Sequence, residues 1–271
     1  MKVGDIISYI LLAIISAFLV FPVVWIFLGS IKTETDILSY PPKWVFEPYF
    51  GHYPSAWVEE GYYKHFGNSL IFCATSIPII LLLAAPAAYA FARFRFRRKQ
   101  DILNWILSAR MFPALALILP LFLWYRNLGL FDTHIGLTLA YVVMNLPLAI
   151  WLLKGFFEEV PRECEEAAMI DGCTAMQAIF RITLPLAAPG LAATAILCTM
   201  FIWNDLVIAL SLSFFNTKTV SIAVATFIGY HEVHWGEMYA GAIISMIPVV
   251  ILAILIQKYI VRGLTFGIVK K

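Results

Sequence analysis

The chain has 271 residues, of which 62% are hydrophobic and only 13% are charged, and its formal net charge is +2. Soluble domains are about 45–50% apolar and about 25% charged, so much of this apolar surplus must face lipid. The small net charge gives no support for nucleic-acid binding. The length fits one membrane domain with little room for a soluble one.

Six stretches are long and apolar enough to cross a bilayer, which takes about 20 residues of helix. They are 6–30, 67–92, 102–125, 136–156, 185–211 and 239–261. Helices are expected because lipid offers no hydrogen-bond partner to an unpaired backbone group. The prolines inside several stretches are interpreted as local kinks. The first stretch is too long for the core of a signal peptide and no small-x-small site follows it, so we expect an anchor. The sequence therefore predicts an all-α membrane protein with six transmembrane helices.

Basic residues set the predicted orientation. Five of them lie between the second and third stretches, and they are Arg93, Arg95, Arg97, Arg98 and Lys99. Because Lys and Arg concentrate in cytoplasmic loops, this loop is predicted to be cytoplasmic. Six spans then place both termini in the cytoplasm. Segments 31–66 and 212–238 fall outside, and the polar loop at about 158–184 falls in the cytoplasm.

The loop at 158–184 carries helix signals of its own. Pro161 suits a first helical turn, and the acidic Glu163, Glu165 and Glu166 complement the positive end of a helix. Gly172 suits the left-handed residue that ends a helix, and Thr174 with Gln177 reads as a capping box. These residues predict a short helix, a sharp turn and a second helix. By themselves they do not distinguish this arrangement from an ordinary re-entry loop.

The same loop resembles the EAA loop of bacterial ABC-importer permeases. Glu166-Ala167-Ala168 is followed by three residues, Gly172, nine residues and Ile182-x-Leu184-Pro185. Six further segments match the carbohydrate-uptake permeases related to the smaller maltose-permease subunit: Asn68-Ser69-Leu70, Ala87 to Phe94, Met111-Phe112-Pro113, Pro147 to Trp151 with Gly155-Phe156-Phe157, Trp203-Asn204-Asp205, and Val261 to Lys271. The resemblance covers roughly residues 10–271. Ile268, Lys271 and Cys173 depart from the usual Ala, Gly and Ala.

This resemblance implies a type I ABC-importer permease fold and a role in ATPase coupling. The EAA loop would form a coupling helix that docks into a separate ATPase subunit, through Glu166, Ala167, Ala168, Asp171, Gly172, Leu184 and Pro185. Gly263, Gly267, Lys270 and Lys271 would make a second ATPase contact; the alternative is a frayed basic tail near anionic lipid. The implied organisation is 1–66 for the first helix and outside segment, 67–261 for the permease core, and 262–271 for a cytoplasmic tail.

The resemblance also implies the partners. They are a homologous second permease, two ATPase subunits, an extracytoplasmic solute-binding protein, membrane lipid and a sugar-like solute. No cofactor is expected in this chain, with ATP and magnesium in the partner ATPase. The expected location is the bacterial or archaeal cytoplasmic membrane, with several passes through it.

Polar residues inside the apolar stretches are candidates for the solute path: Arg110, Asn145, Asn204 and Asp205. A charge within a span should face protein or water, and the Arg fork of donors suits hydroxyls or anions. Alternatively, Arg110 only bonds helix carbonyls or reaches inward to the membrane surface. For Asn204 and Asp205, a structural link to the companion permease is equally compatible with the sequence.

Other function classes have less support. No P-loop, G-x-S-x-G or G-x-G-x-x-G motif occurs, so no enzyme activity is expected here. A secondary transporter would usually carry intramembrane acids and broken repeats. The four cysteines form no Cys-x-x-Cys, and His231-Glu232-Val233-His234 is one residue short of a zincin motif. We therefore expect no metal site.

Overall fold

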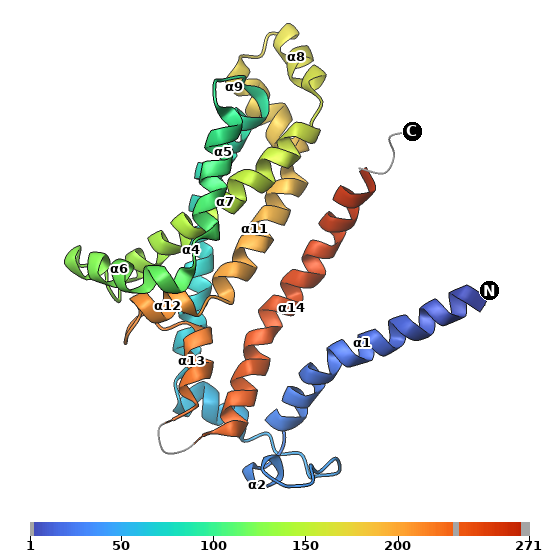
Figure 1. Ribbon diagram of the computed structural model, residues 1–271, viewed down its shortest axis with the longest axis vertical. Coiled ribbons are helices and arrows are strands. Elements are labelled where there is room, and N and C mark those ends of the chain that lie inside the picture. Colours follow the sequence, from blue (N-terminus) through green and yellow to red (C-terminus); the bar gives the residue numbers. More distant parts are fainter. Residues whose placement is uncertain (1–2, 230–232, 267–271) are drawn as a thin grey trace. The chain divides into compact units, whose positions relative to one another are not determined.

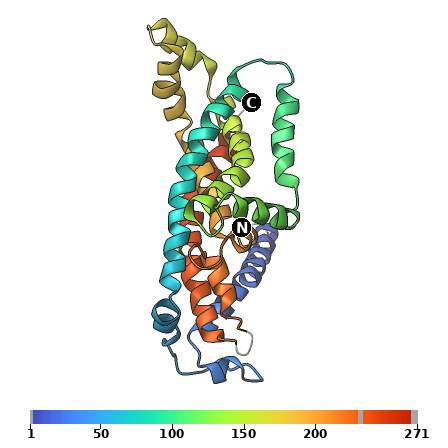
Figure 2. The same cartoon turned by 90° about the vertical axis from the view of Figure 1, so that its left-hand side faces the viewer.

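The computed structural model describes residues 3–229 and 233–266 (Figures 1 and 2). Within these ranges every regular element is helical, apart from one isolated antiparallel bridge between Ile228 and Val233. The prediction of an all-α chain is therefore confirmed.

Within the described residues, four helices are long and apolar enough to cross a membrane by themselves. They are α1 (Val3–Ser30), α4 (Tyr62–Arg93), α7 (His134–Glu159) and α14 (Trp235–Phe266). Two bent pairs of helices also pass the same test, which gives up to six spans if each pair is one span. The predicted count of six and the predicted cytoplasmic termini stay predictions.

The first bent pair replaces the helix with local proline kinks that was expected over 102–125. Helix α5 (Lys99–Ser108) continues into the short 3₁₀ helix η2 (Ala109–Met111), and α6 (Ala114–Asn127) then leaves at 92°. Phe112 between them is extended, with ψ at 131°. A residue before proline is pushed out of the helical region, so Pro113 explains the break. The bend is thus a break between two helices and not a local kink, and Arg110 lies in η2, next to the break.

The expected span at 185–211 is also divided. A π-helical segment, η3 (Ile179–Thr183), and α10 (Leu184–Leu186) meet α11 (Ala188–Trp203) at a bend of 68°. Helix α11 then ends at Trp203, and α12 (Val207–Leu212) follows after three residues. The Asp205 carboxylate accepts the Ala209 N–H at 3.0 Å, which satisfies a donor in the first turn of α12. One helix over 185–211 was therefore wrong as well.

The chain divides into two compact units. One comprises residues 1–66 and 220–247, and it contains α1, α2 (Glu34–Ile37), α3 (His52–Pro54), the π-helical η1 (Ser55–Glu59) and α13 (Val220–Thr226). Its core forms around Tyr62, whose ring stacks on Phe227 with centroids 6.1 Å apart. The Tyr62 hydroxyl donates to the Gly241 carbonyl at 3.0 Å, so the start of α4 is fastened to α14.

The other unit comprises residues 67–219 and 248–271. Helices α7 and α11 run side by side in it, and α12 packs against α6 (Figures 1 and 2). Phe72, Tyr141, Leu153 and Phe157 are fully buried in this core. Helices α8 (Arg162–Ile170) and α9 (Ala175–Ala178) lie beyond the ends of α7 and α11 (Figure 1).

Helix α1 contributes almost nothing to the core of its own unit. Its most apolar window has no buried residues, and large side chains such as Phe18 and Leu19 are exposed. A helix that is apolar all round belongs in lipid or against another chain.

Candidate functional site

The loop that the sequence singles out has the predicted backbone. Helix α8 follows Pro161 directly, and Gly172 ends the turn after it with φ at +93°. That conformation is nearly closed to residues with a Cβ, so a glycine is required there. The predicted left-handed glycine is confirmed.

The second helix of the loop opens with the predicted capping box. The Gln177 N–H donates to Thr174 Oγ1 at 3.3 Å, and the Thr174 N–H donates to Gln177 Oε1 at 2.9 Å. These bonds satisfy two backbone donors that the helix leaves unpaired. The short helix, sharp turn and second helix expected from the sequence are therefore all present.

The loop presents an apolar surface to its surroundings. Met169, Ile170, Met176 and Phe180 are exposed, and Ile170 is 86% accessible. These side chains come from α8, α9 and η3, which follow one another in the chain. Several large exposed apolar side chains close together in the chain suit contact with another protein or with the membrane. We call these four residues the apolar face of the loop.

The predicted coupling residues lie along this same segment. Glu166 and Ala167 are exposed on α8, while Ala168 is half-buried. Asp171 and Gly172 are exposed in the turn that follows α8. Leu184 and Pro185 lie in α10, and Pro185 is exposed. The roles of these residues in ATPase coupling stay predictions.

Glu165 ties α8 to the end of α4. Its Oε1 lies 2.7 Å from Arg93 Nη2 and accepts the Thr183 hydroxyl at 2.9 Å, while Oε2 accepts the Tyr89 hydroxyl at 2.9 Å. The residue is only 7% exposed. One carboxylate thus joins α8, α4 and η3. We call Glu165, Arg93, Tyr89 and Thr183 the Glu165 cluster.

The electrostatics of the cluster keep this carboxylate ionised. Burial by itself would raise the pKa of Glu165, but hydrogen bonds from Arg93, Thr183 and Tyr89 to the charged form outweigh it. The pKa of Glu165 is therefore lowered from 4.5. At neutral pH the cluster holds a full negative charge against the Arg93 guanidinium.

Backbone contacts strengthen the same connection. Arg93 Nη2 also donates to the Val160 carbonyl at 2.9 Å, just before α8. In return, Arg162 Nη2 donates to the carbonyls of Ala92 and Arg93 at 3.4 and 3.3 Å. The last turn of α4 and the first turn of α8 are therefore cross-linked by two arginines.

The sequence did not single out this cluster. Arg93 counted as part of the basic loop and of the matching segment Ala87 to Phe94, and Glu165 only as one of three acids at a helix start. The one available signal was the placement of an arginine at the end of an apolar stretch and of several acids at the start of the loop. Arg93 and Glu165 lie 72 residues apart, and no sequence motif connects two positions at that distance.

The four candidate solute-path residues have separate partners. Arg110 Nη1 donates to the Met144 carbonyl at 3.2 Å, and its guanidinium lies 4.5 Å from the Phe201 ring centre. Asn145 and Asn204 donate to carbonyls one turn earlier in their own helices, at 2.9 and 2.8 Å. Asp205 accepts from Ala209 and, at 3.4 Å, from Tyr141. These bonds do not join the four residues to one another, and the Met144 contact is the kind expected if Arg110 only bonds helix carbonyls.

The predicted C-terminal contact is described only in part. Gly263 lies within α14, which continues to Phe266. Gly267, Lys270 and Lys271 lie outside the described residues, as does Ile268. His231 and Glu232 of the histidine-containing segment also lie outside them.

Comparison with known proteins identifies relatives over nearly the whole chain. A trehalose transport system permease protein of Mycobacterium tuberculosis is 41% identical over 255 residues, covering 92% of each chain. A trehalose/maltose transport system permease protein of Thermococcus litoralis is 35% identical over 270 residues, covering 98% of this chain and 95% of that one.

A solved structure has the same fold. It is a crystal structure of a bacterial ABC transporter involved in the import of the acidic polysaccharide alginate, whose matching chain is 23% identical. The TM-score is 0.78, and the match covers 95% of this chain and 96% of that one.

The model of the family described as binding-protein-dependent transport system inner membrane component matches residues 76–266. This range includes α7, the loop with the Glu165 cluster and α11, and the chain belongs to that family.

Proposed function

We propose that this chain is one of two permease subunits in an ATP-driven importer of sugars or related polyhydroxylated solutes. Its partners are a homologous second permease, two ATPase subunits that bind ATP and magnesium, and an extracytoplasmic solute-binding protein. The complex resides in the cytoplasmic membrane of a bacterium or archaeon. This chain supplies half of the solute pathway and hydrolyses no ATP itself.

The observation that carries the proposal is the apolar face of the loop together with the Glu165 cluster behind it. An ATPase subunit covers Met169, Ile170, Met176 and Phe180, and Glu166 lies beside them. Because Glu165 and Arg93 fasten α8 to α4, a displacement of the loop moves the end of a membrane-spanning helix with it. The cluster thus supplies a mechanical link between ATP-driven motion and the pathway.

The solute class rests on the relatives. Both curated relatives named above carry disaccharides in their descriptions, and the structural neighbour belongs to a polysaccharide importer. Arg110, Asn145, Asn204 and Asp205 are the proposed polar residues of the pathway. Their hydrogen-bonding groups suit hydroxyl-rich solutes. The Phe201 ring beside the Arg110 guanidinium offers an apolar surface next to hydrogen-bond donors, and a sugar ring has both apolar and polar faces.

Transport in proteoliposomes tests the proposal. The chain is co-purified with its second permease and ATPase subunits and reconstituted with ATP and magnesium enclosed, and the binding protein is added outside with radiolabelled trehalose or maltose. We expect uptake that requires both the enclosed ATP and the binding protein. Uptake that continues without the ATPase subunits would contradict the coupling. If a panel of disaccharides fails while the binding protein still stimulates ATP hydrolysis, the sugar class alone is wrong.

A further inference from the structure

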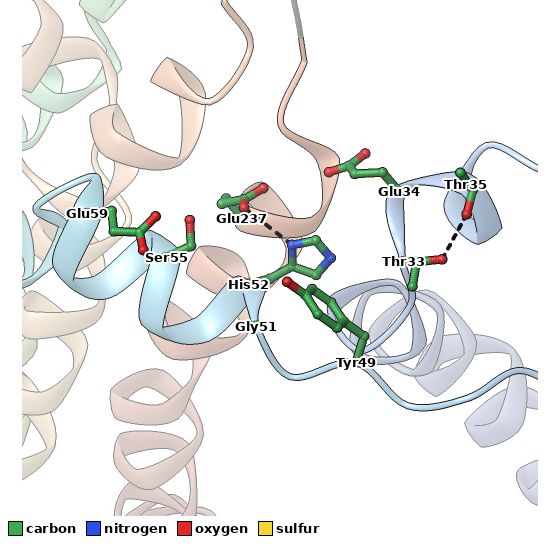
Figure 3. A pocket seen from close by; sticks show the side chains of 9 residues that line it. All are labelled: Thr33, Glu34, Thr35, Tyr49, Gly51, His52, Ser55, Glu59 and Glu237. Atoms are coloured by element: carbon green, nitrogen blue, oxygen red, sulfur yellow. Dashed lines mark hydrogen bonds and ion pairs between the residues drawn. The ribbon is translucent and has the colours of Figure 1, made fainter.

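Three potential metal ligands converge in the unit formed by residues 1–66 and 220–247. One ligand atom from each of Glu34, His52 and Glu237 lies within 4.8 Å of the other two. They border a pocket of about 520 Å³, and Figure 3 shows the two glutamates approaching the His52 ring from different segments. His52 is buried, and both glutamates are half-buried. The proposed import function uses none of these residues.

The orientation of His52 is fixed by its second nitrogen. Nε2 lies 2.8 Å from the Lys32 carbonyl, and a carbonyl oxygen can only accept, so Nε2 carries a proton. Nδ1 is then the nitrogen directed at Glu237. A histidine that binds a metal through one nitrogen usually donates its other N–H to a carbonyl or carboxylate in this way.

The contact between Nδ1 and Glu237 has the spacing of two ligands on one ion. Nδ1 lies 3.3 Å from Glu237 Oε1. A charge-assisted hydrogen bond between these groups would be about 2.7–2.9 Å long. In a tetrahedral zinc site with bonds of about 2.0–2.2 Å, neighbouring ligand atoms are about 3.3–3.5 Å apart. The same contact meets the criteria of an ion pair, and its length also accommodates a cation held between the two atoms.

Local packing holds the ligands in place. The Gly236 N–H donates to Glu34 Oε1 at 3.0 Å, which directs that carboxylate toward the start of α14. A Cβ on Gly236 would overlap the His52 ring, so glycine permits the ring to lie against α14. The Tyr49 ring meets the His52 ring edge-on with centroids 4.9 Å apart. The site is therefore supported by Gly236, by Tyr49 and by the Lys32 carbonyl described above.

We propose that Glu34, His52 and Glu237 bind a divalent transition-metal ion of the zinc or manganese type. One imidazole and two carboxylates are ligands that these ions accept, whereas calcium and magnesium prefer oxygen alone. The three residues supply three positions, and the fourth faces the pocket for water. The ion joins the segment around Glu34 and His52 to the start of α14, and its role is structural.

Zinc binding to the purified full chain tests this site. Cys164 and Cys173 are half-buried thiols that could also bind zinc, so all variants carry C164A and C173A. Affinity is measured by competition with a chromophoric chelator. We expect one Zn²⁺ per chain, at least 10-fold weaker binding in Glu34→Gln and in Glu237→Gln, and loss of binding in His52→Gln. Added Zn²⁺ should also raise the thermal unfolding midpoint, and a chelator should reverse the rise.

Two controls remove the same chemistry from neighbouring positions. Glu59→Gln changes another carboxylate of the pocket, and His234→Gln changes a histidine close in the chain to Glu237. Both should keep wild-type affinity within twofold. If His52→Gln does not fold, the two glutamate variants still decide the question. The proposal is overturned if the parent protein binds no stoichiometric zinc, or if the glutamate variants bind it as the controls do.

Discussion

Glu165 is the residue on which the proposed coupling depends most. In Glu165→Gln the charge is lost while the shape is kept, and Arg93 retains a buried guanidinium without its counter-charge. We expect the variant to lose about 1–3 kcal/mol of local stability and to transport less solute per ATP hydrolysed. Glu163→Gln, an exposed acid in the same turn of α8, is the matched control. Equal behaviour of the two variants would remove Glu165 from the coupling.

The same carboxylate predicts a pH dependence. Its pKa in the folded chain is below 4.5, so its stabilising contribution is complete above about 4.5 and is lost as the pH falls through the lower folded value. Hydrogen exchange of the α8 amides should therefore be constant from neutral pH down to about pH 5 after correction for the intrinsic exchange rate. Protection should decrease only under more acidic conditions. Loss of protection between pH 8 and 6 would contradict this assignment.

Gly172 allows a test of the turn itself. A residue with φ at +93° is strained by any Cβ, and β-branched valine suffers most, at about 1–3 kcal/mol. We expect Gly172→Val to insert into the membrane but to lose transport and ATPase stimulation, both measured in the reconstituted complex. Gly172→Asn should be milder, because asparagine enters left-handed conformations more readily. Full activity of the valine variant would show that the turn tolerates change.

At the scale of residues, the contacts that could be predicted were those between residues close together in the chain. Gly172, Thr174 and Gln177 were predicted because their partners lie within a few residues, where spacing determines geometry. Arg93, which pairs with Glu165, and Glu237, which pairs with His52, lie 72 and 185 residues from those partners. Pairs of that kind depend on the packing of whole helices, which a single sequence does not specify.

At the scale of elements, one carboxylate organises the connection that follows α12. Asp132 precedes α7 with φ at 54°, and its two oxygens accept the N–H groups of Phe214, Phe215, Asn216 and Thr217 at 3.0–3.2 Å. Burial alone would raise the pKa of Asp132, but these hydrogen bonds and that of the Thr217 side chain lower it to about 2. The turn is therefore built around a negative charge.

Asp132→Asn should loosen this turn. Asparagine also adopts left-handed backbone, so the substitution mainly removes charge and acceptor capacity. We expect faster hydrogen exchange at amides 214–217 with α7 unaffected. In the parent chain the contribution of Asp132 is complete above pH 3.8 and is lost as the pH falls toward 2, so exchange at pH 5–8 should show no titration. Unchanged exchange in the variant would assign the turn to its own backbone.

The elements themselves were only partly predictable. Apolar runs located every long helix, because the length needed to cross a bilayer is a strong constraint. The breaks at Pro113 and after Trp203 were missed, since apolar composition continues through both. Proline marks a possible break, yet Pro78 and Pro86 lie within the unbroken helix α4. Whether a proline kinks or breaks a helix depends on its neighbours in space.

At the scale of the whole molecule, chemical labelling of the native cysteines tests the predicted orientation of the chain in the membrane. Cys73 and Cys198 are buried, whereas Cys164 and Cys173 are half-exposed in the loop of α8. If that loop faces the cytoplasm, a membrane-impermeant maleimide should label inverted vesicles but not intact spheroplasts. The double variant C164A/C173A should show no labelling in either. Labelling of intact spheroplasts at these residues would reverse the topology.

The discontinuous unit of residues 1–66 and 220–247 has a consequence for the timing of synthesis. His52 and Glu237 are 185 residues apart, and the partner of Glu34 is 202 residues away. At about 5–20 residues per second, Glu237 leaves the ribosome roughly ten to forty seconds after His52. The segment made early must therefore wait through the insertion of the intervening helices. The part of the protein that is translated first is completed among the last.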